Sequence, residues 1–279
     1  MLKNYLEFGS IKNNQKRRYE IKKGNLYDWY MLPRYFNDLH ILDKFTKSNN
    51  LKKLSKKLHH KEDLKFNFTI LLLLKVSKFR IFYEFGQTLF EKIYFLKVFS
   101  NYFNIRNLKK IRWRGNDISE MFNFFCKNFY KNLDIKVFNK LDKKSVKNSS
   151  FFAKGVTLLY LKNNMDVLNN VINKSESGSF DISLVKSKNN VHLNTGKILY
   201  YPTIREFDNL IKNSNKQFLF RNIKVENQNK IYLEVIYGKD NIINKYLKEL
   251  DFYNKKLQKN KFVKNLLGLN LKVRKNKYY

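Results

Sequence analysis

The chain of 279 residues carries 57 lysines and arginines against 23 aspartates and glutamates, a formal net charge of +34. A surface this basic repels itself unless a polyanion neutralises it, so the composition favours nucleic acid or an anionic membrane as partner. The single cysteine excludes an intrachain disulfide and a cysteine-rich zinc site. Because the basic excess runs through the whole chain, we expect a nucleic-acid-binding protein rather than a generically basic one.

Residues 1–65 are predicted to form a basic N-terminal extension. Basic and aromatic side chains alternate in it, as where Arg17 and Arg18 precede Tyr19. This alternation suits a segment laid along RNA, where cations meet phosphates and rings stack on bases. A solvated end is the alternative, which explains the charges but not the rings. The adjacent His59 and His60 lack the i, i+4 spacing of a helical metal pair, so no metal site is expected.

Residues 66–154 are predicted to form a helical body with an insertion at about 101–154. The apolar run that begins at Phe68 is far shorter than the ~20 residues of a membrane-spanning helix and reads as core. In the insertion, Arg112 and Arg114 flank a tryptophan in a cluster that either clamps RNA or caps a helix. The aromatic residues of 121–133 predict a buried helix, with a cofactor-binding segment as the less favoured alternative.

The segment from residue 158 to residue 211 has the most regular pattern. Apolar residues recur at gaps of three and four over 158–172, which predicts an amphipathic helix. Turn formers follow, and 180–185 then predicts two helical turns with Ser179 as N-cap, although its alternation also fits a strand. A hairpin is predicted from strands at 191–193 and 198–201 around a loop that contains Gly196, and Pro202 ends the second strand.

This order of helix, short helix and hairpin resembles the RNA-binding domain of the small-subunit ribosomal protein four ("S-four") family. The residues that carry the resemblance are Leu161 and Asp166 in the first helix, Leu193-Asn194-Thr195-Gly196-Lys197 and Pro202 in the hairpin, Thr203 and Asp208 after it, and Phe82, Tyr83 and Phe90 in the helical body. Asn163, Asn164 and Ser183 stand where the family has arginines, and Glu84 stands where it has glycine.

The resemblance implies an α+β fold: a helical body plus a small RNA-binding domain of two helices packed on a short antiparallel sheet, with basic extended ends. The S-four-like domain would span 155–237, and a C-terminal helix and basic tail would span 238–279. Strands are predicted at 218–225 and 230–237, the second of which has alternating apolar residues, and helical spacing follows at 241–261.

Basic side chains in matching places, with one asparagine of the hairpin, are the candidate RNA-binding residues. They are Lys75, Lys78, Arg80, Lys162, Lys186, Lys188, Asn194, Lys197 and Arg205 in the body and hairpin domain, and Arg17, Arg18, Arg112 and Arg114 elsewhere.

The function that the resemblance implies is that of a structural constituent of the small subunit of the mitochondrial ribosome, and not of an enzyme. Its partners would be small-subunit rRNA, neighbouring small-subunit ribosomal proteins, and mRNA where it enters the subunit, with no cofactor, metal or membrane span. The residue palette of an AT-rich gene and a start unlike a transit peptide favour an organelle-encoded protein bound to ribosomes in the mitochondrial matrix. The alternatives are an RNA-modifying enzyme with the same small domain, such as a pseudouridine synthase, and an accessory subunit of a respiratory complex.

Overall fold

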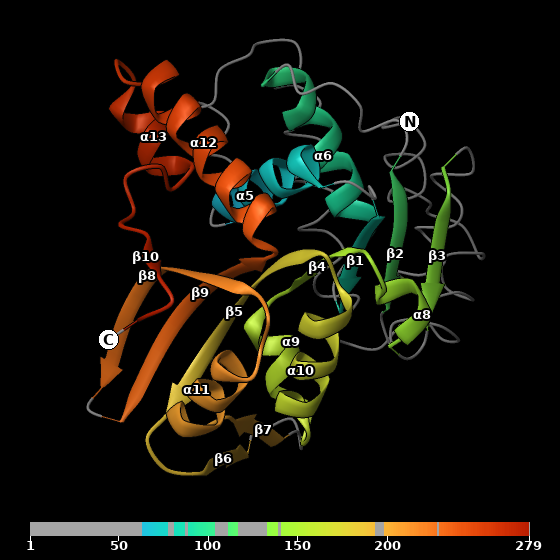
Figure 1. The fold of residues 1–279 in the computed structure, drawn as a ribbon, viewed down its shortest axis with the longest axis vertical. Helices are drawn as coiled ribbons and strands as arrows, with labels where there is room; N and C mark the ends of the chain where they lie inside the picture. Colours follow the sequence, from blue (N-terminus) through green and yellow to red (C-terminus); the bar gives the residue numbers. More distant parts are fainter. Residues whose placement is uncertain are drawn as a thin grey trace, which may run out of the picture.

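The computed structural model describes residues 63–77, 81–86, 89–103, 111–116, 133–138, 141–192, 198–227 and 229–278. Their centre is an eight-stranded mixed sheet with the order β10-β8-β9-β5-β4-β1-β2-β3 (Figure 1). The strands are β1 (Ile81–Phe85), β2 (Arg112–Asn116), β3 (Ile135–Phe138), β4 (Ser150–Ala153), β5 (Ser177–Val185), β8 (Gln217–Asn227), β9 (Lys230–Gly238) and β10 (Arg274–Lys275). A separate hairpin pairs β6 (Asn189–His192) with β7 (Ile198–Tyr201).

The first five strands of the large sheet run parallel, and the last strands turn back. β3, β2, β1, β4 and β5 pair in parallel with their neighbours, whereas β9 is antiparallel to both β5 and β8. Parallel strands need covering on both faces of their sheet. In β1, Phe82 belongs to one hydrophobic cluster and Tyr83 to the cluster on the opposite face.

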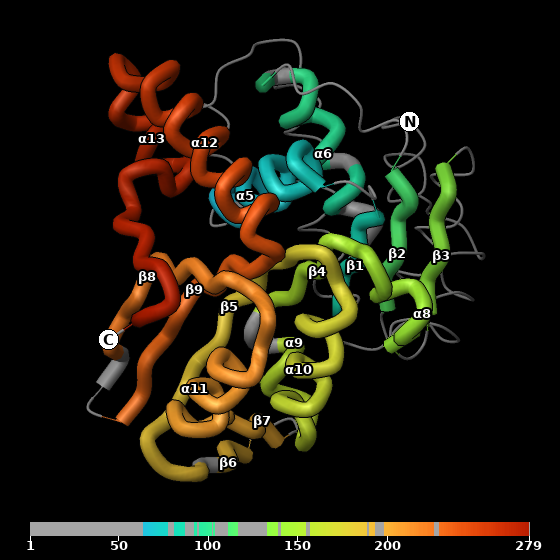
Figure 2. Tube along the Cα trace, viewed as in Figure 1, coloured from blue at the N-terminus to red at the C-terminus, as the bar shows by residue number. Residues whose placement is uncertain are grey.

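Helices cover both faces of the sheet (Figures 1 and 2). On one face the core is built from α5 (Asp63–Val76), α6 (Leu89–Tyr102) and α12 (Asp240–Lys256). On the other it is built from α8 (Lys143–Val146), α9 (Gly155–Leu159), α10 (Asn164–Lys174) and α11 (Ile204–Lys212). The short α13 (Lys261–Leu266) follows α12. The chain therefore has a doubly wound, Rossmann-like α/β fold.

The predicted α+β fold with a small S-four-type domain is wrong. Residues 180–185 are not a helix but the second half of β5, which pairs with β4 on one side and with β9 on the other. Ser179 is consequently a strand residue whose hydroxyl donates to Val235 O at 3.0 Å, not an N-cap. Strands of the predicted body and of the predicted RNA-binding domain thus share one sheet.

Local periodicity was nevertheless a sound guide to several elements. The hairpin strands, their end at Pro202, and the strands at 218–225 and 230–237 are confirmed as β6, β7, β8 and β9. The predicted helix over 158–172 is two helices, α9 and α10, separated at residues 160–163. The predicted helix over 121–133 lies outside the described residues. Within the described part of the chain, no helix is long and apolar enough to cross a membrane.

Helix α11, which fixes the end of the hairpin against β5, begins with a reciprocal capping box. Thr203 Oγ1 accepts from Glu206 N at 3.2 Å, and Glu206 Oε2 accepts from Thr203 N at 2.8 Å. We predict that Thr203→Ala lowers the free energy of unfolding by about 1 kcal/mol, because Glu206 N loses its acceptor and the Glu206 carboxylate loses the bond from the Thr203 hydroxyl. Thr203→Ser keeps the oxygen and should lose much less in urea denaturation. Equal losses in the two variants would contradict the capping role.

Candidate functional site at the carboxyl edge of the sheet

The two central strands send the chain to opposite faces of the sheet. After β1 the chain enters α6 on one face, and after β4 it enters α9 and α10 on the other. In doubly wound sheets ligands bind in the crevice outside the carboxyl ends of the strands at such a switch point. The carboxyl ends of β1 and β4 therefore mark the candidate site.

A tight turn at Gly86 closes the carboxyl end of β1. Gly86 has φ +66°, its N–H donates to Asn116 O of β2 at 2.7 Å, and its carbonyl accepts from the Thr157 hydroxyl of α9 at 3.0 Å. A Cβ at Gly86 would lie 1.9 Å from Thr157 Cγ2. The turn therefore requires glycine for two reasons: glycine tolerates the positive φ, and it has no Cβ that would clash with Thr157.

The turn carries only the start of a dinucleotide fingerprint. Gly86 is the first glycine of a G-x-G-x-x-G pattern, but Thr88 and Glu91 stand at the second and third glycine positions. Those later glycines let the backbone approach a pyrophosphate and let the helix pack closely on the strand. The sequence at this turn thus does not suit a pyrophosphate cofactor such as a nicotinamide dinucleotide.

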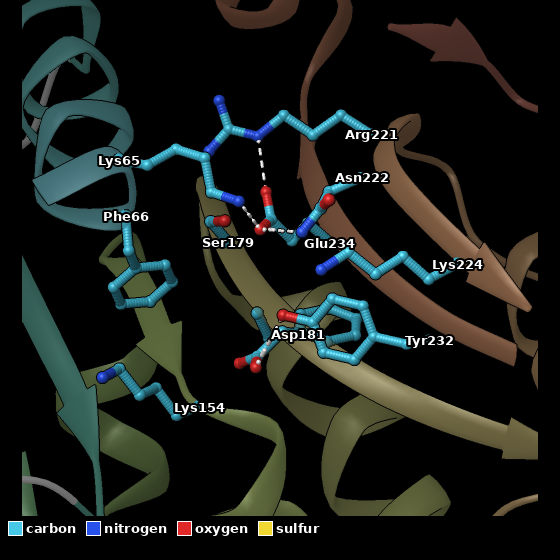
Figure 3. Close-up of a pocket in the computed structure, with 11 residues that line it drawn as sticks. Lys65, Phe66, Lys154, Ser179, Asp181, Arg221, Asn222, Lys224, Tyr232 and Glu234 are labelled. Carbon is cyan, nitrogen blue, oxygen red and sulfur yellow. Dashed lines mark hydrogen bonds and ion pairs between the residues drawn. The ribbon is translucent and has the colours of Figure 1, made fainter. Parts of the chain in front are cut away.

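Beside this edge lies a cavity of about 250 Å³, between the start of α5, the residue after β4, and the middle of β5, β8 and β9 (Figure 3). Lys65 and Phe66 of α5 line one side, and Lys154 follows the end of β4. Asp181 of β5 and Tyr232 of β9 line the sheet side. Its position next to the end of β4 makes it part of the same candidate site.

One carboxylate of the cavity is neutralised within the protein. Glu234 accepts from Arg221 Nε at 2.9 Å and from Asn222 Nδ2 at 2.8 Å, and it forms an ion pair with Lys65. Arg221, only 2% exposed, also donates to the hydroxyl of Thr69. A buried charge is tolerated only when it is paired in this way, so these residues form a fixed wall.

A second carboxylate is held by a tyrosine. The Tyr232 hydroxyl donates to Asp181 Oδ2 at 3.1 Å. Burial, with the nearby charge of Asp181, raises the pKa of Tyr232, so its hydroxyl remains a donor at neutral pH. A carboxylate offers about four acceptor positions, which is more than this one bond occupies.

Four of the predicted RNA-binding residues gather around the β6–β7 hairpin. Lys162, Lys186, Lys188 and Arg205 are exposed. Backbone and side-chain bonds hold their segments together: Asn164 Nδ2 donates to Tyr200 O at 2.7 Å, and Val185 N donates to Pro202 O at 3.0 Å. They form a basic edge patch, defined as Lys162, Lys186, Lys188 and Arg205.

The other predicted residues are dispersed. Lys75, on α5, pairs with Glu249 of α12 at 2.6 Å, and Arg112 is exposed on β2. The remaining candidates, Arg17, Arg18, Lys78, Arg80, Asn194 and Lys197, lie outside the described residues.

Arg114 is buried and engaged within the protein. Its guanidinium donates to Asp134 Oδ1 at 2.9 Å and Oδ2 at 3.0 Å, and to Trp113 O at 2.8 Å. The hydrogen bonds from Arg114 hold the pKa of Asp134 below its usual value. This ion pair therefore stabilises the fold above the pKa of an unfolded aspartate and is lost as the pH falls through the folded pKa.

Sequence reasoning missed the cavity residues Asp181, Arg221, Tyr232 and Glu234. The available signal was charge inside two otherwise apolar strands, at Asp181 in β5 and Glu234 in β9, which are cross-strand neighbours. Among the described residues, no group of three or more histidine, cysteine, aspartate or glutamate side chains could hold a metal ion.

No family model and no curated protein matches this sequence. Several solved structures with a similar chain path are named as methyltransferases or were determined with S-adenosylhomocysteine. The N-terminal domain of EvdMO1, determined with S-adenosylhomocysteine and D-fucose, is 10% identical with a TM-score of 0.46, over 65% of this chain and 84% of that one. An S-adenosylmethionine-dependent methyltransferase from Clostridium acetobutylicum is 10% identical with a TM-score of 0.43, over 77% and 100%. Magnesium protoporphyrin IX methyltransferase from Synechocystis is 9% identical with a TM-score of 0.39, over 84% and 94%.

At these identities and TM-scores the likeness carries no information about the ligands of this chain. The predicted membership of the S-four ribosomal family is wrong. The predicted non-enzymatic role in the mitochondrial ribosome is also wrong, because the domain that implied it is part of a Rossmann-like sheet. The predicted partners, which were rRNA, ribosomal proteins and mRNA, rested on the same domain and are wrong for the same reason.

The contact between Gly86 and Thr157 predicts that Thr157→Ser changes stability in opposite directions in the parent chain and in the G86A variant. Gly86→Ala should lower the free energy of unfolding by roughly 1–2 kcal/mol, because alanine disfavours the positive φ of this position. The clash of the new Cβ with Thr157 should lower it by about 1–3 kcal/mol more. Thr157→Ser alone should cost about 1 kcal/mol for the lost methyl, yet it should stabilise the G86A variant because it removes the clashing atom. Thermal or urea unfolding of the four proteins measures this. Additive losses would contradict the close packing of α9 on the turn.

The neighbours Arg112 and Arg114 should behave differently when each is changed to glutamine. Arg114→Gln leaves buried acceptors without donors and should cost roughly 1–3 kcal/mol of stability. Arg112→Gln should change stability by no more than about 0.5 kcal/mol. Chemical denaturation of the two variants and of the parent chain measures the difference. An R114Q variant as stable as R112Q would contradict the structural role of Arg114.

Proposed function

We propose that this chain is an RNA-modifying enzyme, an S-adenosylmethionine-dependent methyltransferase that acts on RNA. The observation that carries the proposal is the strand order β3-β2-β1-β4-β5-β9-β8, with β9 antiparallel between two strands that run with the parallel set. An antiparallel strand inserted in this place is the arrangement of Rossmann-like methyltransferases. The edge of the sheet where such enzymes bind ligands is the edge that carries Gly86 and the cavity.

The residues at the switch point fit S-adenosylmethionine better than a dinucleotide. Gly86 supplies the tight turn that ends β1, and the second glycine of the pattern, which this chain lacks, serves a pyrophosphate that S-adenosylmethionine does not have. Glu84, buried at the end of β1, places a carboxylate near the site of a cationic cofactor. Gly86, Asn116 and the segment after β4 are the residues that would hold it. When bound, the cofactor supplies an electrophilic methyl group.

RNA is the proposed substrate class because of the charge and where it lies. The net charge of +34 calls for a polyanionic partner. The basic edge patch of Lys162, Lys186, Lys188 and Arg205 lies around the β6–β7 hairpin, at the end of the molecule to which β5 points (Figure 1). Lysines there would neutralise phosphates while the cavity faces a base. We further propose that the protein acts in the mitochondrion, supported by the residue palette of an AT-rich organellar gene.

The direct test is methyl transfer with tritiated S-adenosylmethionine. Purified protein is incubated in separate reactions with total RNA and with total protein from the source cells. We predict label in RNA that becomes soluble after nuclease treatment, because the basic edge patch delivers RNA to the site. Label in protein alone, or no label in any fraction from a folded enzyme, would overturn the proposal.

A matched pair of triple variants tests the edge patch. Changing Lys186, Lys188 and Arg205 to glutamine should lower RNA labelling and reduce the slope of log K against log salt by up to about 3, one per lost phosphate contact. Changing Lys245, Lys248 and Lys259 on and after α12 removes the same charge from exposed positions toward the opposite end of the molecule (Figure 2). This control should retain most of the labelling. Equal losses would mean that charge alone, and not its place, matters.

A further inference from the structure

The cavity beside β4 has two aromatic walls. Figure 3 shows Phe66 of α5 on one side and Tyr232 of β9 across from it, with Asp181 between them. Phe66 is held in place by an edge-to-face contact with Phe152 at 6.4 Å between ring centroids, with Lys92 Nζ 5.5 Å from its centroid. Two rings set across a gap with a hydrogen-bonding group between them suit a flat heterocycle.

The polar groups favour a base over a phosphate. Arg221 and Lys65 both pair with Glu234, so their donors are engaged within the protein, and the three groups together keep a single positive charge. Asp181 presents carboxylate oxygens, which repel a phosphate but accept hydrogen bonds from the ring N–H or exocyclic amino group of a base. The volume of about 250 Å³ lies below the ~300–1,000 Å³ of drug-sized ligand sites, which suits one ring system rather than a dinucleotide.

The surroundings suit a base that arrives attached to a strand. At Asn222, with φ +51°, the pairing of β8 with β9 shifts register before Lys224. Lys224 is exposed and lines the cavity. A cation in that place can meet the phosphates on either side of an extruded nucleotide.

We propose that this cavity receives a single nucleobase of an RNA strand, turned out of the strand and placed between Phe66 and Tyr232 with its N–H groups on Asp181. The proposal deepens the proposed function, since the base would then lie beside the carboxyl end of β4, and it rests on that function for RNA as the ligand. Tyr232 has two roles, because its ring forms a wall and its hydroxyl orients Asp181.

The test is equilibrium binding without any cofactor, so its outcome does not depend on methyl transfer. The full chain is titrated into fluorescein-labelled RNA decamers of A, of C, of U, and of U with one central G, at one salt concentration, with fluorescence anisotropy as readout. Tyr232→Ala should weaken binding by roughly 5- to 150-fold, the loss typical of one stacked base. Tyr232→Phe keeps the ring and should lose only about 2- to 10-fold. Asp181→Asn should flatten the differences among the decamers, because the acceptor that reads the base is changed.

Phe252→Ala is the matched control, since Phe252 is 53% exposed on α12, away from the cavity. It should leave affinity within about twofold. Equal losses in Y232A and F252A, with unchanged preference in D181N, would overturn the proposal, because RNA would then be held by surface rings and charge alone. A second outcome would also overturn the proposal. If a free nucleoside binds the parent chain but not Y232A, while Y232A binds RNA as tightly as the parent chain does, the cavity is a site for a small molecule. A failure of methyl transfer with the predicted binding pattern would leave this site standing and remove the proposed chemistry.

Discussion

In the centre of the sheet, β1 pairs in parallel with β4, a segment almost seventy positions later in the chain. Two stacked aromatic pairs accompany this pairing, Phe82 with Phe152 at 5.1 Å on one face and Tyr83 with Phe151 at 5.9 Å on the other. Because both faces of the pair are apolar, both must be covered by helices, and the connections from β1 and β4 leave to opposite faces. The switch point, the turn at Gly86 and the neighbouring cavity all follow from this one strand pairing.

Charge is divided into two populations with different physical roles. Inside, Arg221 and Arg114 are paired with carboxylates and satisfy local polar groups, which is how a buried charge avoids its desolvation cost. Outside, lysines far outnumber acidic groups, and an isolated exposed ion pair such as that between Lys188 and Glu206, at 3.8 Å, stabilises little. The surface excess therefore contributes little to the stability of the fold, and we propose that it serves to recognise a polyanion.

The sequence predicted local elements better than their assembly. The glycine-containing loop predicted the hairpin, and the period of two in residues 230–237 predicted β9. The start of β5 was predicted to be part of a turn, because residues 173–178 are turn formers that include Gly178. The structure explains this glycine by crowding: a Cβ at Gly178 would lie 2.3 Å from Phe151 O and 2.6 Å from the Tyr237 hydroxyl oxygen, so a larger residue does not fit there. The periodicity of apolar residues in a sequence does not show which distant strands pair. Asp181 and Tyr232 come together only through such a pairing, that of β5 with β9. A resemblance built on the hairpin could not detect it.

We propose that the carboxyl edge around Gly86 binds S-adenosylmethionine-type ligands and not dinucleotides. Amide hydrogen exchange of the full chain with and without S-adenosylhomocysteine tests this binding, with NAD as the matched control ligand. Exchange at residues 84–86 and 153–157 should be slower with S-adenosylhomocysteine, exchange in α12 should be unchanged, and NAD should have no effect. Equal exchange in those two segments at saturating S-adenosylhomocysteine, or the same protection by NAD, would contradict it.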